Sequence, residues 1–126
     1  MKKIISLIIN FLLIPVARVF IFILSPVGVA WELVRNPSVE YWGKYFKKIA
    51  VSYDQTGNAI NGQMLTDCLG NGEGEKFGNP DETVSGIVGK KKKSNTLSHL
   101  GWAIAVCLNK IEKDHVEKAI EEDEQS

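Results

Sequence analysis

The first 34 residues form an almost uninterrupted apolar run with only four charges, on Lys2, Lys3, Arg18 and Glu32. Its central part, residues 4–24, contains one charged side chain and one amide, Asn10. A helix needs about 20 apolar residues to cross the hydrocarbon core of a bilayer. We therefore expect residues 1–35 to be a membrane-anchoring segment and the remainder of the chain to be soluble.

Two prolines leave the form of this segment open, because proline removes a backbone donor and kinks a helix. Pro15 and Pro26 allow either one kinked span, with Arg18 near its middle, or a shallow re-entrant hairpin. We favour the span, since the apolar length suffices and proline is tolerated in membrane helices. Basic residues lie on both flanks, so charge does not select the cytoplasmic end. A cleaved signal peptide is disfavoured because Arg18 interrupts the apolar stretch.

The next apolar positions recur with the period of a helix. Asn36-Pro37 supplies an N-cap and a first-turn proline. One apolar stripe follows, made of Trp42, Tyr45, Phe46, Ile49 and Tyr53. The stretch 62–78 contains five glycines and no periodic pattern. We predict a long helix from residue 36 and a Gly-rich loop over residues 62–78.

Three shorter helices are predicted beyond this loop. A capping box at residues 79–83 opens the first, which extends to about Val88 and ends at Gly89 and the lysines. The second is capped by Ser94 or Asn95, and its apolar positions are Leu97, Leu100, Ile104, Leu108 and Ile111. A capping box formed by Asp114 and Glu117 opens the third, which frays into an acidic tail over residues 121–126.

These patterns predict an all-α protein, because no alternating strand pattern of useful length occurs. We expect an N-terminal membrane helix, kinked or re-entrant, followed by a small bundle of three to four helices in residues 36–120. The chain has 126 residues, so about 90 remain for one small domain, and a large multi-domain enzyme is excluded.

Charge and cysteine content exclude further classes. The net charge is zero, and the lysine run 90–93 is interpreted as a solvated loop, so a nucleic-acid partner is not expected. Cys68, placed in the loop, and Cys107, placed in a helix, lack a CxxC or Cys/His pattern. A disulfide framework or zinc site is therefore not expected, and a reducing compartment is the default.

Candidate chemistry lies in two polar clusters. The long helix carries Asp54, Gln55, Asn58 and Asn61, and the capped turn carries Asp81, Glu82, Thr83 and Ser85. If the two helices pack together, Asp54 and Asn58 face a helix N-terminus that offers free N–H groups and a partial positive charge.

Two interpretations follow from these clusters. The first is a hydrogen-bond network that orders the domain. The second is an active site with candidate residues Asp54, Asn58, Asp81, Glu82 and His115. In that case Asp54, Asp81 and Glu82 are the candidate ligands of a divalent metal ion. We favour the network, because capping already accounts for Asn79, Asp81 and Glu82. No phosphate-binding loop or G-x-S-x-G motif is present.

The order of these residues resembles a group of short, uncharacterised proteins of tailed bacteriophages that infect Gram-negative hosts. The shared pattern is DQxxN, a spacer, PDETxS, a basic stretch and DH before an acidic end. Here it falls on Asp54-Gln55 with Asn58, on residues 80–85, and on Asp114-His115. The spacer is longer in this chain, and Gly86 stands where an arginine is frequent. The resemblance implies a phage protein used during infection and no particular activity.

The leading hypothesis is a non-enzymatic, membrane-anchored phage accessory protein without a cofactor. It would hold its helical domain on the cytoplasmic side of the host bacterial inner membrane, contact membrane lipid and bind a phage or host protein. The alternative is a small membrane-bound hydrolase that uses Asp54, Asp81, Glu82 and His115, with or without a divalent metal ion, on envelope or nucleic-acid material. A pore-forming lysis protein is weaker, because only one apolar segment exists.

Overall fold

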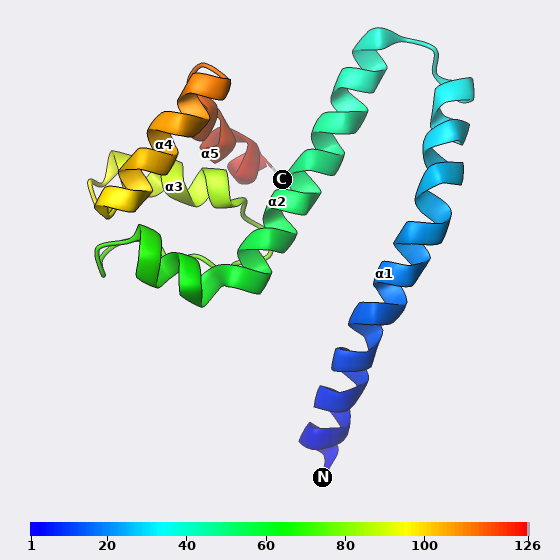
Figure 1. Cartoon of the computed structure of the whole chain (residues 1–126), viewed down its shortest axis with the longest axis horizontal. Helices are drawn as coiled ribbons and strands as arrows, with labels where there is room; N and C mark the ends of the chain where they lie inside the picture. The colour runs from blue at the N-terminus through cyan, green and yellow to red at the C-terminus, as the bar shows by residue number, and fades with distance from the viewer. Residues whose placement is uncertain (126) are drawn as a thin grey trace. The chain divides into compact units, whose positions relative to one another are not determined.

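The computed structural model describes residues 1–125, which form five α-helices (Figure 1). They are α1 (Lys2–Arg35), α2 (Val39–Leu69), α3 (Val84–Lys93), α4 (His99–Ile111) and α5 (His115–Gln125). Within the described residues, strand pairing is limited to one isolated antiparallel bridge between Gly70 and Leu97. The predicted all-α class, with four helices after the apolar one, is confirmed.

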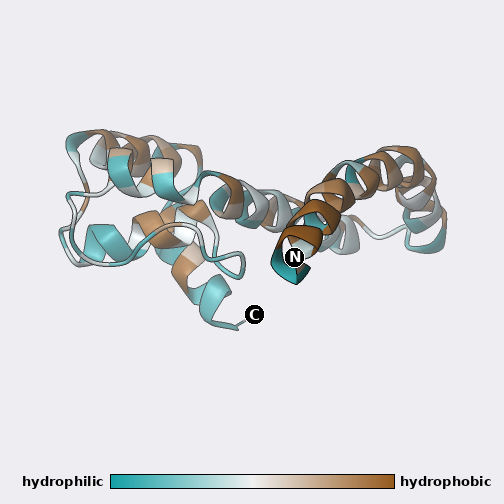
Figure 2. Ribbon diagram, turned by 90° about the horizontal axis from the view of Figure 1, so that it is seen from below, coloured by the Kyte–Doolittle hydropathy of each residue, from teal (hydrophilic) through white to brown (hydrophobic). Residues whose placement is uncertain are grey.

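The first compact unit, residues 1–44, contains one long apolar helix. α1 is continuous through Pro15 and Pro26, so the re-entrant hairpin alternative is wrong. None of its residues is buried, and Figure 2 shows hydrophobic residues along its length. In residues 1–125, α1 is the one helix that is long and apolar enough to cross a membrane, judged by length and composition.

The connection from α1 to α2 differs from the predicted capping. Asn36 ends α1, because its backbone N–H donates to the Glu32 carbonyl at 2.9 Å and its side chain to the Glu32 carboxylate at 3.1 Å. Ser38 begins α2, since its carbonyl accepts from the Trp42 N–H at 3.1 Å. The Tyr41 hydroxyl donates to Glu32 at 2.6 Å. These contacts place the boundary between the two units after Lys44 and not after residue 35.

The predicted Gly-rich loop begins eight residues too early, because α2 continues through Gly62 to Leu69. A Cβ atom on Gly62 would lie 2.4 Å from the Gly78 Cα atom, so this glycine permits a loop to pass close to the helix. The side chains of Asn61 and Thr66 donate to carbonyls four residues earlier. Such bonds often bend helices, and α2 changes direction in this region (Figure 1). Cys68 therefore lies in a helix and not in a loop.

The core of the second unit surrounds α3. Ile87 and Val88 are completely buried, and they belong to a cluster with Leu69, Phe77, Leu97, Ala105 and Val116. A Cβ atom on Gly89 would lie 2.2 Å from the Val116 carbonyl oxygen, so this glycine lets α5 approach α3. The glycine that the sequence suggested as a helix end is thus a packing position inside the helix.

Both predicted ends of α3 are wrong. The helix begins at Val84 with Thr83 as its N-cap, whose hydroxyl oxygen accepts from the Gly86 N–H. Asn79 instead closes a turn, in which its side-chain oxygen accepts from the Asp81 N–H at 3.1 Å. At the other end, α3 continues through the lysines to Lys93, where positive charge complements the helix dipole.

The lysine run is not a solvated loop. Lys91 is 1% exposed, and its ammonium group donates to the Glu73 carbonyl at 2.7 Å. Burial lowers the pKa of Lys91. Lys90 pairs with Glu82, and Lys92 pairs with Glu117. Three of the four lysines therefore hold the domain together.

The last two helices also start with caps that were not predicted. α4 begins after Ser98, whose hydroxyl oxygen accepts from the Gly101 N–H at 3.1 Å, so Ser94 and Asn95 do not cap it. The first turn of α5 is capped from α4, because the Val116 N–H donates to the Asn109 side chain at 3.0 Å. Glu117 bonds Asn109 and Lys92 and forms no capping box with Asp114.

The predicted acidic tail is part of the folded domain. α5 continues to Gln125, and Ser126 lies outside the described residues. Glu122 forms an ion pair of 2.5 Å with Lys47, and Asp123 accepts hydrogen bonds from Thr83. The domain of the second unit therefore extends beyond residue 120.

Candidate functional site

Asp54 joins α2 to the N-terminus of α3. Its carboxylate accepts from the Val84 N–H at 2.9 Å, from the Ser85 N–H at 3.4 Å and from the Ser85 hydroxyl at 2.9 Å. A helix N-terminus carries a partial positive charge, which favours a carboxylate there. The predicted meeting of Asp54 with the 79–85 turn is therefore present, although the carboxylate bonds residues 84 and 85.

Asn58 is completely buried and fastens the loop before α3 to α2. Its side-chain oxygen accepts from the Gly78 N–H at 2.9 Å. Its amide nitrogen donates to the carbonyls of Asn79 and Glu82, at 2.9 and 2.8 Å. The neighbouring Gln55 donates to the Asp81 carbonyl at 3.1 Å. Asn58 thus satisfies three backbone groups of the loop at once.

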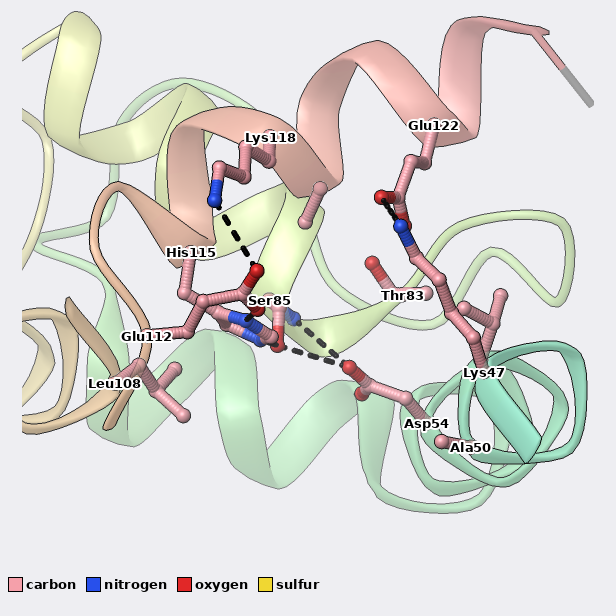
Figure 3. A pocket seen from close by; sticks show the side chains of 12 residues that line it. Lys47, Ala50, Asp54, Thr83, Ser85, Leu108, Glu112, His115, Lys118 and Glu122 are labelled. Carbon is pink, nitrogen blue, oxygen red and sulfur yellow. Dashed lines mark hydrogen bonds and ion pairs between the residues drawn. The ribbon is translucent and has the colours of Figure 1, made fainter. Parts of the chain in front are cut away.

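His115 lies between Ser85 and Glu112 and so links the Asp54–Ser85 contact to Glu112 (Figure 3). Its Nε2 lies 3.3 Å from the Ser85 Oγ, and its Nδ1 lies 2.9 Å from a Glu112 carboxylate oxygen. Glu112, His115, Ser85 and Asp54 form, in this order, a series of hydrogen-bonding side chains drawn from the end of α4, α5, α3 and α2. Hydrogen bonds from His115 and Lys118 hold the pKa of Glu112 at about 2.

A cavity of about 470 Å³ lies beside these hydrogen-bonded side chains. Its polar lining includes Lys47, Asp54, Ser85, His115 and Glu122, and its apolar lining includes Ala50, Val51, Leu108 and Ala119. Lys47 and Glu122 pair across it, as Figure 3 shows. The side chains around the cavity thus carry both signs of charge, and those charges neutralise one another locally.

The predicted carboxylate cluster is not assembled. The Asp81 side chain is exposed, whereas the Glu82 carboxylate pairs with Lys90 and accepts from the Asn79 side chain at 3.1 Å. Among residues 1–125, no group of three or more His, Cys, Asp or Glu side chains is arranged to hold a metal ion. The structure therefore separates Asp81 and Glu82 from Asp54 and leaves His115 beside Ser85.

The amide donors at the start of α3 are already engaged. Those of Val84 and Ser85 bond Asp54, and that of Gly86 bonds the Thr83 hydroxyl. Acyl transfer needs preorganised donors aimed at the developing oxyanion. The Ser85 hydroxyl also donates to Asp54, so in this structure the Asp54 carboxylate caps the N-terminus of α3.

Two residues of this network were not predicted. Glu112 precedes His115 by three residues, a spacing that brings side chains together at a helix end, so the signal was available in the sequence. Asp123 accepts from the Thr83 N–H and hydroxyl, each at 3.0 Å, and burial raises its pKa. Its position within an acidic stretch concealed this contact.

The lowered pKa of Glu112 predicts an acid-sensitive contribution to stability. Its folded pKa of about 2 lies below its ordinary value of 4.5, so the contribution is complete above pH 4.5 and is lost as the pH falls towards 2. Glu112→Gln should remove this part of the acid destabilisation. Urea melts of the full chain in detergent at pH 6 and pH 3 measure it, with Glu121→Gln on α5 as the matched control. An unchanged difference between the two pH values in Glu112→Gln would contradict the assignment.

Comparisons of the chain with protein-family models, curated proteins and solved structures found no match.

Proposed function

We propose that this protein is a membrane-anchored accessory protein, in which α1 holds a small helical domain at a bilayer and the domain binds a protein partner. The observation that carries the proposal is the exposure of α1, whose 34 residues include none that is buried. A helix of this length extends for about 50 Å, more than the roughly 30 Å of a hydrocarbon core. Lipid is the environment that removes such a surface from water.

The phage origin that the motif resemblance implies is part of the proposal, as is the cytoplasmic face of the host inner membrane as the site of action. Residues of this motif contact one another: Asp54 bonds Ser85, and Asn58 donates to the Glu82 carbonyl. Residues that satisfy each other's hydrogen bonds in this way stabilise the fold. This supports an accessory protein over an enzyme.

Membrane fractionation of bacteria that express the full chain tests the anchor. We expect the protein in the membrane pellet, resistant to alkaline carbonate and extracted by detergent, because a spanning helix is not displaced by charge changes at the surface. Recovery in the soluble fraction, or release by carbonate, would contradict the proposal.

A small membrane-bound hydrolase is the second candidate, and one observation favours it. Ser85, His115 and Glu112 follow the order of a nucleophile, a base and an orienting carboxylate, with 3.3 and 2.9 Å between them. The engaged amide donors of α3 stand against it. Ser85→Ala separates the two candidates, because it removes the hydroxyl and leaves the rest of the chain intact.

For an accessory protein, we expect Ser85→Ala to cost about 1–2 kcal/mol of stability, because the hydroxyl takes part in two hydrogen bonds, to Asp54 and to His115. We also expect it to preserve complementation of a phage lacking the gene. Thermal melts in detergent and plaque assays measure both quantities on the same variant. Ser52→Ala on α2 is the control for loss of a serine hydroxyl. Normal melting together with abolished complementation in Ser85→Ala alone would contradict a purely structural role for Ser85 and would favour the hydrolase instead.

A further inference from the structure

α4 carries large apolar side chains on its outer face as well as on its inner face. Trp102, Ile104 and Leu108 pack against the core. Gly101 and Ala105 are buried, whereas Leu100 and Ile111 are 54% and 83% exposed. A Cβ atom on Gly101 would lie 2.3 Å from the Leu69 carbonyl oxygen, so a larger residue does not fit there. A surface helix of a soluble domain is normally polar on its outer face, so the apolar outer face of α4 departs from that pattern.

The exposed side chains lie along one face of the helix. Positions 100, 103, 107 and 111 follow the three- and four-residue spacing of a single stripe, to which we give the name α4 face. Ala103 and Cys107 are exposed between the larger members. The α4 face therefore offers an apolar strip about three turns long.

The basic side chains on α4 are His99 and Lys110, which lie three turns apart along the same edge of the α4 face. The exposed Lys113 follows the helix, between Glu112 and Asp114. Residues 99–111 include no aspartate or glutamate. The nearest acidic side chain in the sequence, Glu112, already bonds His115 and Lys118. An apolar face bordered by basic residues is complementary to the acyl and headgroup layers of an anionic bilayer.

We propose that α4 is a second membrane contact, whose apolar face lies in the interfacial layer of an anionic bilayer. The inference rests on the anchoring proposed for α1, because a tethered domain meets lipid at a high effective concentration. Contact with lipid covers Leu100, Cys107 and Ile111, while Lys110 and Lys113 reach anionic headgroups. The domain is then held against the membrane surface by two contacts of different strength.

Cys107 is a natural probe, since it is an exposed thiol on the α4 face. The full chain with Cys68→Ser is labelled at Cys107 with a small fluorophore and reconstituted into phosphatidylcholine vesicles containing phosphatidylglycerol. We expect quenching by a lipid-borne nitroxide and protection from aqueous iodide. A label at Glu121→Cys, in a chain with both native cysteines changed to serine, is the control and should be quenched by iodide.

Two variants test the chemistry of the contact. Lys110→Gln should lower the lipid-bound population of α4 roughly fivefold, the size expected for one basic residue near an anionic surface. Ile111→Glu should expose the Cys107 label to iodide, because a carboxylate on the face opposes burial in lipid. Circular dichroism confirms that both variants remain helical. Neither variant should change flotation of the protein with the vesicles, which depends on α1.

Each other outcome overturns the inference in a distinguishable way. Flotation with a Cys107 label that iodide quenches would leave the anchor intact and exclude the second contact. Protection from both quenchers, with cross-linking between copies through Cys107, would assign the α4 face to a second copy of the chain. Absence from the floating vesicles would overturn both the anchor and the α4 contact.

Discussion

Deletion of residues 2–35 should transfer the protein from the membrane fraction to the soluble fraction. α1 contains no buried residue, and the buried core cluster lies entirely between Leu69 and Val116. The deletion therefore removes the apolar surface that requires lipid without opening the core. We expect carbonate-resistant association to be lost completely, because a single amphipathic face binds membranes reversibly whereas a spanning helix does not.

The result is measured by fractionation of cells that express the full or the truncated chain, with circular dichroism to confirm helix content. Replacement of residues 4–24 by an unrelated apolar helix of 21 residues should restore membrane association, which separates an anchoring role from a specific sequence requirement. A truncated chain that still resists carbonate would show that the anchor lies elsewhere, and the aromatic stripe at the start of α2 would then be the first candidate.

The helical class and the long apolar segment could be predicted because both depend on local pattern. An apolar run of this length signals its environment without knowledge of any partner. The periodic positions of α2 and α4 likewise identify helices before their neighbours are known. A local pattern does not show which segments lie close together in the fold. The main errors, in the helix ends and in the partners of polar residues, arose for this reason.

Glycine shows why the helix ends were misplaced. Gly62 and Gly89 suggested a loop and a helix end, because glycine is a weak helix former. In the structure they lie inside α2 and α3, at points where a Cβ atom would meet Gly78 or the Val116 carbonyl. A tertiary contact decides these positions, and a single sequence gives no sign of it. The caps at Thr83 and Ser98 were missed for a related reason, since several serine, threonine and asparagine residues nearby are equally good N-caps.

The polar network was half predictable. Asp54 and Asn58 stood out as polar residues on a helix that should pack, and both do bond the segment before and at the start of α3. Glu82 was grouped with Asp54 because both carry carboxylates, but the lysine run, interpreted as solvated, supplies Lys90 as its partner. The grouping of residues by chemistry alone could not show that a lysine in the last turn of α3 pairs with Glu82, while Asp54 bonds the first turn of the same helix.

Asn58→Ala should strongly destabilise the second unit. The side chain is completely buried and serves the Gly78 N–H and the carbonyls of Asn79 and Glu82. Each buried group left without a partner costs about 1–3 kcal/mol, so we expect a loss of roughly 3–5 kcal/mol. That is a large fraction of the total for a domain of this size, at about 0.05–0.15 kcal/mol per residue. The loop before α3 should therefore detach or the domain unfold.

Asn61→Ala is the matched control, because Asn61 lies one turn further along α2 and donates only to the Gly57 carbonyl of its own helix at 3.0 Å. Its loss should change stability by less than about 0.5 kcal/mol, as for most surface substitutions. Urea unfolding of the full chain in detergent, followed by circular dichroism, compares the two variants with the parent.

Asn58→Asp refines the test, since it keeps the acceptor for Gly78 but removes the donor for both carbonyls. Its unfolding midpoint should therefore lie near that of Asn58→Ala. Equal unfolding midpoints for Asn58→Ala and Asn61→Ala would mean that the loop is held by other contacts and that the hydrogen bonds of Asn58 contribute little to stability.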